Sequence, residues 1–205
     1  TDHNCAFHVR LFHRLCRDAG LAAVCGVEVA TAEEVHVLAL FDDPDAAEDL
    51  GRIAYASLPE IPNDEAFYGI QPIVNEKEEV LDFAAKALSF STSIPIGRLV
   101  ELVHERGGLC IPSHVERPYS GVIDRLGFIP DEPFDAVEVS RRTPPGERAS
   151  LAGGFPYISN SDAHTLEDVG AEWNLLRMDT FRLAAVPETV HHPAEPAGKM
   201  KGTAP

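Results

Sequence analysis

The 205-residue sequence lacks several features that would assign it to common protein classes. Its four cysteines form no C-x-x-C pair and mostly sit inside apolar runs, which indicates buried, reduced thiols. No apolar run approaches the roughly 20 residues of a membrane-spanning helix. The first residues also lack the basic and apolar regions of a signal peptide. These absences predict a cytoplasmic protein without a membrane partner.

Positive charge is also scarce. The chain has 17 Lys and Arg against 33 Asp and Glu, a formal net charge of −16. A surface of this sign repels polyanions, which argues against extended nucleic acid as a partner. A small phosphorylated substrate is still compatible, because bound cations reverse the potential locally.

The length and even composition indicate one domain, predicted to span residues 1–186. Residues 187–205 mix Pro, Gly and charge with almost no apolar side chains, a composition that predicts a disordered tail. His191 and His192 are assigned to this tail and not to a site. Nothing in the sequence indicates the oligomeric state.

Apolar runs typical of buried strands alternate with helical patterns along the chain. The predicted strands are 21–29, 35–41, 109–114, 134–140 and 157–164. The main predicted helices are 5–19, 75–88, 96–106 and 179–185. Such alternation is typical of a parallel α/β barrel or a doubly wound sheet, whose site lies at the carboxyl edge of the strands.

Side chains of the metal-ligand type occur at or near strands in several places. They are His3, Glu28, His36, His114, Asp162 and His164. Taken alone, His36 reads as a hydrogen-bonded core histidine and Asp162 as a turn residue. A buried Glu28, however, needs a partner. The recurrence of these residue types favours a cluster suited to zinc, manganese or iron.

The segment 157–164 ends in the triplet Asp162-Ala163-His164. If it is a strand, Asp162 and His164 point to the same side, because strand side chains alternate. Thr165 and Asp168 then predict the cap of a following helix. The triplet is therefore expected where a strand passes into a helix.

These motifs resemble the PHP (polymerase and histidinol phosphatase) domain family, in its form as small stand-alone phosphoesterases. The matching stretches, in the family's order, are Thr1-Asp2-His3, Gly26-Val27-Glu28, Val35-His36-Val37-Leu38, Ser113-His114 and Ser161-Asp162-Ala163-His164. The resemblance covers about residues 1–170. It implies a distorted (β/α)7 TIM-like barrel with two or three divalent metal ions.

The resemblance also implies that all six residues are ligands, with Glu28 bridging two metals. The family's first motif, a His-x-His pair, would precede Thr1. We therefore expect the first strand and helix of the barrel, and two ligands of one metal, to be missing from this chain.

The implied reaction is hydrolysis of a small phosphate ester by a metal-bridged hydroxide. Arg117, which follows His114, is predicted to bind the phosphate and to act in catalysis together with His164. Arg141, after the fourth predicted strand, is a second candidate for phosphate binding. Each arginine also has an ordinary reading as a surface salt bridge.

Two other functions fit the same residues. An amidohydrolase-like enzyme would direct the same metals at a C–N bond, and the fold alone does not decide between these reactions. A non-catalytic metal-binding PHP module of a larger protein is the second alternative.

The irregular segment 59–72, with Phe67 and Tyr68, is read either as a loop that closes over the substrate or as a segment packed against the barrel.

Overall fold

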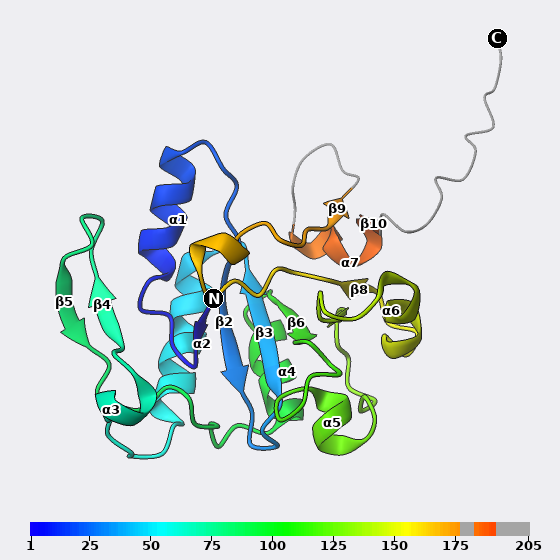
Figure 1. The fold of residues 1–205 in the computed structure, drawn as a ribbon, viewed down its shortest axis with the longest axis horizontal. Coiled ribbons are helices and arrows are strands. Elements are labelled where there is room, and N and C mark those ends of the chain that lie inside the picture. Colours follow the sequence, from blue (N-terminus) through cyan, green and yellow to red (C-terminus); the bar gives the residue numbers. More distant parts are fainter. Residues whose placement is uncertain (177–182, 192–205) are drawn as a thin grey trace, which may run out of the picture.

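A four-stranded sheet forms the centre of the fold in a computed structural model, which describes residues 1–176 and 183–191 (Figure 1). Its strands, in spatial order, are β1 (Asp2–His3), β2 (Cys25–Ala30), β3 (His36–Phe41) and β6 (Leu109–Pro112). β1 runs parallel to β2, whereas β3 is antiparallel to both β2 and β6. The architecture is mixed α/β.

The prediction of uniformly parallel strands is wrong at β3. The connection from β2 is the short loop 31–35, in which the Glu34 amide donates to the Thr31 carbonyl at 2.9 Å. A parallel return needs a crossover of about a dozen residues or more. The loop is too short for that, so the chain reverses and forms a hairpin.

A second pair of strands lies beyond β6. β7 (Val137–Glu138) and β8 (Tyr157–Ile158) are parallel to each other, and the Asp135 amide donates to the Cys110 carbonyl of β6 at 3.1 Å. Among the described residues the strands do not close into a barrel. The predicted TIM-like barrel is therefore not confirmed, and the structure shows an open sheet.

The two faces of the sheet bury different sets of side chains. On one face, Val27 and Val37 pack with helices α2 (Pro44–Ala56) and α4 (Ile96–His104). The other face carries a smaller cluster, comprising Leu38, Leu109, Ile111, Ala136, Ile158, Leu183 and Val186. Because side chains alternate along a strand, Glu28 lies on this second face, opposite Leu38 in the register.

The segment between α2 and α4 differs from its prediction. It contains α3 (Glu65–Tyr68) and a hairpin of β4 (Pro72–Val74) and β5 (Val80–Phe83), which projects from the body of the fold (Figure 1). The helix predicted over 75–88 is wrong. The Asn75 side chain accepts hydrogen bonds from the Lys77 and Glu79 amides, at 2.9 and 3.0 Å, and so forms a turn at the point where the helix was expected to begin.

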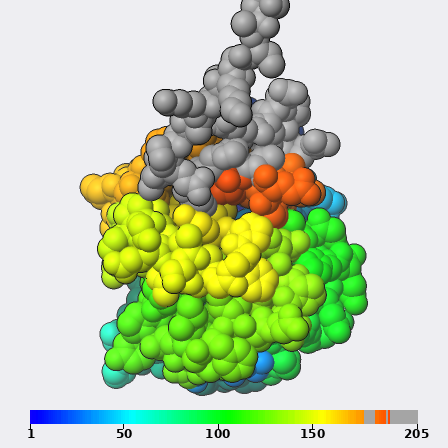
Figure 2. All heavy atoms as spheres, turned by 90° about the vertical axis from the view of Figure 1, so that its right-hand side faces the viewer, coloured from blue at the N-terminus to red at the C-terminus, as the bar shows by residue number. Residues whose placement is uncertain are grey.

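Three further helices lie outside the α2 and α4 pair, and the first of them, α1 (Val9–Asp18), contacts α2 and β2. α1 begins later than predicted, and Val9 is its buried residue. α5 (Val122–Leu126) and α6 (Pro145–Leu151) lie on the side of the molecule shown in Figure 2. No helix among the described residues is long and apolar enough to cross a bilayer.

Part of the predicted tail has regular structure. η2 (Leu183–Ala185) leads into α7 (Val186–Thr189), and β10 (Val190–His191) pairs with β9 (Leu175–Leu176). Residues 187–191 therefore belong to the fold. Residues 192–205, which include His192, lie outside the described residues, as do residues 177–182, which include the first part of the helix predicted over 179–185.

Candidate metal centre

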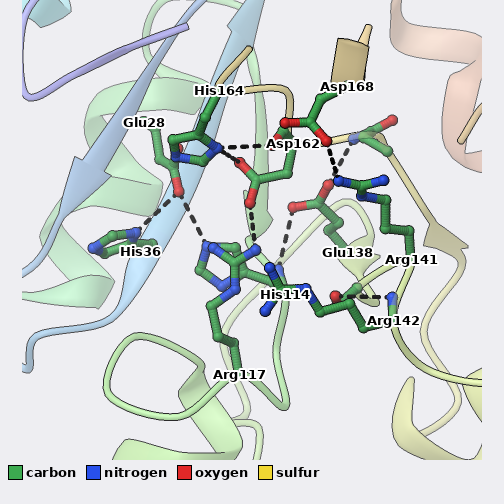
Figure 3. Close-up of polar contacts among 12 residues, drawn as sticks. Glu28, His36, His114, Arg117, Glu138, Arg141, Arg142, Asp162, His164 and Asp168 are labelled. Carbon is green, nitrogen blue, oxygen red and sulfur yellow. Dashed lines mark hydrogen bonds and ion pairs between the residues drawn. The ribbon is translucent and has the colours of Figure 1, made fainter. Parts of the chain in front are cut away.

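Glu28 is the centre of a cluster of three imidazoles on the second face of the sheet. Its side chain is 9% exposed. Glu28 Oε1 lies 3.0 Å from His36 Nδ1 and 3.3 Å from His114 Nε2, and Oε2 lies 3.8 Å from His3 Nδ1. Figure 3 shows the His36 and His114 contacts converging on this carboxylate. The partner that a buried Glu28 requires is thus a set of histidines.

Strand register explains this convergence. His3 is the register partner of Glu28 across the parallel β1–β2 pair. On the hairpin Glu28 faces Leu38, and His36 lies two residues from Leu38 on the same side of β3. Long side chains reach such a diagonal neighbour. His114 follows β6, which pairs with β3.

Three of these residues have the geometry of a metal site. One ligand atom from each of His3, Glu28 and His36 lies within 4.8 Å of the others. The fourth residue, His114, is 2% exposed, and neither of its ring nitrogens has a hydrogen-bond partner, since the 3.3 Å contact with Glu28 lacks hydrogen-bond alignment. Buried polar atoms are rarely left without partners. An unpartnered buried imidazole beside a carboxylate fits a transition metal.

The electrostatics favour the protonation states that metal ligands require. Burial would raise the pKa of Glu28, but the contacts with His114 and His36 outweigh it and hold the pKa well below its usual range. Burial lowers the pKa of His3, although the charge of Glu28 opposes this. A carboxylate next to imidazoles is a donor set suited to a divalent ion.

Sequence reasoning missed Glu138, on β7. It is 5% exposed, and it accepts hydrogen bonds from the His114 amide at 3.2 Å and from the Asn160 side chain at 2.9 Å. Burial raises the pKa of Glu138 to about 7. The electrostatic interaction with His114 opposes this rise, and the negative charge of Glu28 adds to it. The signal was present, because Glu138 interrupts an apolar run just as Glu28 does.

Asp162 and His164 lie in a loop and not in a strand. β8 ends at Ile158, Asp162 has a φ of +46°, and the helix predicted after the triplet is a 3-10 turn, η1 (Leu166–Asp168). The argument from strand alternation is therefore wrong. Both residues nevertheless line a cavity of about 620 Å³ that also contains His3, Glu28 and Glu138. All six predicted ligands thus gather in one region.

The two predicted phosphate-binding arginines both form ion pairs. Arg117 pairs with Asp162 and Arg141 with Asp168 (Figure 3), and all four side chains are partly buried. Arg117 is thus bound to Asp162, a predicted ligand that lines the cavity. Arg141 is bound to Asp168, the last residue of η1.

No protein-family model matches the sequence. The uncharacterised protein YqxK of Bacillus subtilis (strain 168) is 36% identical over 86 residues, covering 38% of this chain and 22% of that protein. Among solved structures, the lesion-specific endonuclease PfuEndoQ from Pyrococcus furiosus matches with a TM-score of 0.52 at 18% identity, covering 80% of this chain and 38% of that one. The likeness to PfuEndoQ is one of fold. The chain spans well under half the length of each protein.

Proposed function

We propose that the chain carries the metal centre of a PHP-type phosphoesterase that hydrolyses a small phosphate ester. The observation that carries this proposal is the buried carboxylate of Glu28 surrounded by three histidines, one of which has no hydrogen-bond partner. The fold likeness to an endonuclease, an enzyme that cleaves phosphodiester bonds, supports the same reaction class.

In this proposal His3, Glu28, His36 and His114 hold the metal, and Asp162 and His164 complete the set from the loop. The residue types suit zinc, manganese or iron, and the resemblance to the PHP family implies two or three such ions. When bound, such ions act as Lewis acids toward the phosphoryl group and lower the pKa of water. Glu28 faces all three imidazoles and would be the central ligand of the set.

The other side chains orient the reacting groups. Arg117, fixed by Asp162, offers its remaining N–H groups to phosphate oxygens. Glu138 orients His114 through the backbone amide and Asn160 through its side chain. Arg141 is the weaker candidate for phosphate binding, because its partner Asp168 does not line the cavity, whereas Asp162, the partner of Arg117, does.

Metal analysis together with an activity assay tests this proposal. The chain and the complete gene product would be purified and analysed for bound metal, and then assayed with an aryl phosphate and an aryl amide in added Mn²⁺. We expect two or more metal ions and turnover of the phosphate in the complete protein. Glu28→Gln should abolish both, whereas the exposed control Glu65→Gln should change neither.

Each alternative predicts a different result. Turnover of the amide but not of the phosphate would indicate an amidohydrolase-like enzyme. Bound metal without turnover of either compound would indicate a non-catalytic module. Absence of metal from every preparation would contradict the metal centre itself.

A further inference from the structure

A second cavity adjoins the candidate metal centre. It has a volume of about 310 Å³ and is lined by residues of β1, α3 and β4, by the chain between β1 and α1, and by the chain that follows β5. His3 lines both this cavity and the larger one that contains Glu28 and His164. A group bound here would therefore contact a predicted metal ligand.

Three of the polar side chains around this cavity, Asp2, His8 and Gln71, are already bound within the protein. His8 Nδ1 lies 3.1 Å from Asp2 Oδ2, and His8 Nε2 accepts the Val74 amide at 3.2 Å, so Nδ1 carries the proton. Gln71 donates to the Lys86 carbonyl and accepts from the Leu88 amide, each at 2.9 Å. A hydroxyl-rich ligand would have to displace these bonds.

The surface that remains for a ligand is apolar and aromatic. Phe7 is 38% and Tyr68 42% exposed, and both rings line the cavity, as does Leu88. Each ring is fixed by an edge contact with a second aromatic ring, at a centroid distance of 5.3 Å for Phe7 with Tyr55 and 5.5 Å for Tyr68 with Phe90. Rigid aromatic faces of this kind stack on flat groups.

We propose that this cavity binds the planar aromatic or heterocyclic group of the substrate. The bound ring would lie beside His3, and its phosphate ester would extend into the larger cavity. A volume of about 310 Å³ lies at the lower end of known ligand pockets, which suits one or two fused rings. The negative charge of Asp2 disfavours the phosphate itself in this cavity. This inference rests on the proposed phosphoesterase function.

The neighbouring aromatic residue provides a matched control. Phe67 precedes Tyr68 in α3 but is 83% exposed and does not line the cavity. Both side chains are exposed enough for truncation to preserve the fold. The segment 59–72, read from the sequence as either lid or packing, thus contributes the Tyr68 ring to the cavity, whereas the Phe67 ring lies outside it with its centroid 6.4 Å from that of Tyr68.

The first experiment measures turnover of benzyl phosphate and ethyl phosphate by the complete protein. Both esters have alkoxide leaving groups of similar basicity, so the ratio of their kcat/KM values reports recognition of the ring. Tyr68→Ala should lower this ratio by about tenfold, since aromatic contacts contribute up to ~1.5 kcal/mol. Tyr68→Phe and Phe67→Ala should leave it unchanged.

The second experiment does not depend on turnover. Titration with benzylphosphonate and methylphosphonate, followed by NMR or calorimetry, should show tighter binding of the benzyl compound, lost in Tyr68→Ala and kept in Phe67→Ala. Equal affinities, or equal losses in both variants, would overturn the inference. Binding that depends on Tyr68 without hydrolysis of any phosphate ester would retain the cavity assignment and refute the phosphoesterase.

Discussion

The two halves of the candidate centre are held in different ways. The strand half consists of His3, Glu28 and His36, which project from β1, β2 and β3. The loop half consists of Asp162 and His164, in a segment without regular structure. Register fixes the strand half before any ligand binds, whereas an ion pair with Arg117 holds the loop half.

Exposure separates the two halves less clearly than register does. In the strand half the side chains of Glu28 and His3 are 9% and 43% exposed, and in the loop half those of Asp162 and His164 are 26% and 65% exposed. A donor set that strand register has preorganised binds a metal with little rearrangement, whereas a loop has to be ordered by the ion it binds. We therefore expect metal affinity to reside mainly in the strand half.

The largest effect is expected from Glu28→Gln. Removing the charge that faces three imidazoles should abolish metal binding to the strand half and lower kcat/KM by about 10³-fold or more, because several kcal/mol of Lewis-acid stabilisation are lost. Metal analysis and steady-state kinetics of the complete protein measure this. A variant that keeps its full metal content would show that Glu28 has only a structural role.

A substitution in the loop half should remove only part of the bound metal. Asp162→Asn should lower the number of bound metal ions without emptying the strand half. The free energy of unfolding of the metal-free protein should fall by less than about 1 kcal/mol, because the Arg117 ion pair is partly exposed. Metal stoichiometry and denaturant unfolding test both statements. Loss of all metal from this variant would mean that the two halves bind as a single unit.

Arg117→Ala tests whether the arginine that holds the loop half also binds the phosphate of the substrate. Losing charge-assisted hydrogen bonds to phosphate, worth about 1.5–3 kcal/mol, should lower kcat/KM by about 10- to 100-fold. Arg117→Lys should recover part of this loss, because a lysine keeps the charge but not the bidentate geometry. The matched control is Arg141→Ala, with a smaller expected effect. Equal kinetics for wild type and Arg117→Ala would remove Arg117 from the site.

The last prediction concerns Glu138 and the dependence of stability on pH. Its pKa is raised from 4.5 to about 7, so between these pH values the folded state keeps a proton that the unfolded state has lost. The free energy of unfolding therefore falls as pH rises through this window, by at most about 1.4 kcal/mol per pH unit. Unfolding of the metal-free protein at pH 4.5–7 should show this trend in wild type, relative to Glu138→Gln. Parallel pH profiles for the two proteins would contradict the assignment.

The residues of the strand half could be predicted from the sequence for a physical reason. A carboxylate or imidazole in an apolar run must find a partner, and Glu28 and His36 occur in two such runs close together in the chain. The same reasoning applied to the run around Glu138 would have found that residue too. The hairpin was likewise predictable, since the loop 31–35 is too short for a crossover.

Other features of the fold and the site depend on contacts that the pattern of apolar residues in the sequence does not encode. The spacing of Val80 and Leu81 suits a helix, but the Asn75 side chain forms a local turn and both residues become exposed in β5. The segment 157–164 was predicted to be a strand, yet only Tyr157 and Ile158 pair with β7, and the Ser, Asn and Asp that follow are typical of turns. The pairing of Arg117 with Asp162 follows from tertiary structure alone.

The β2–β3 hairpin also has a consequence for how the protein folds. It brings Glu28 and His36 together across a sequence separation of only 8 residues. Hairpins form in about 1–10 μs, whereas contacts between distant segments wait for long loops to close. We expect these two side chains to meet early, and His114 and Asp162 to join them only as the distant segments dock. The centre would then assemble in stages during refolding.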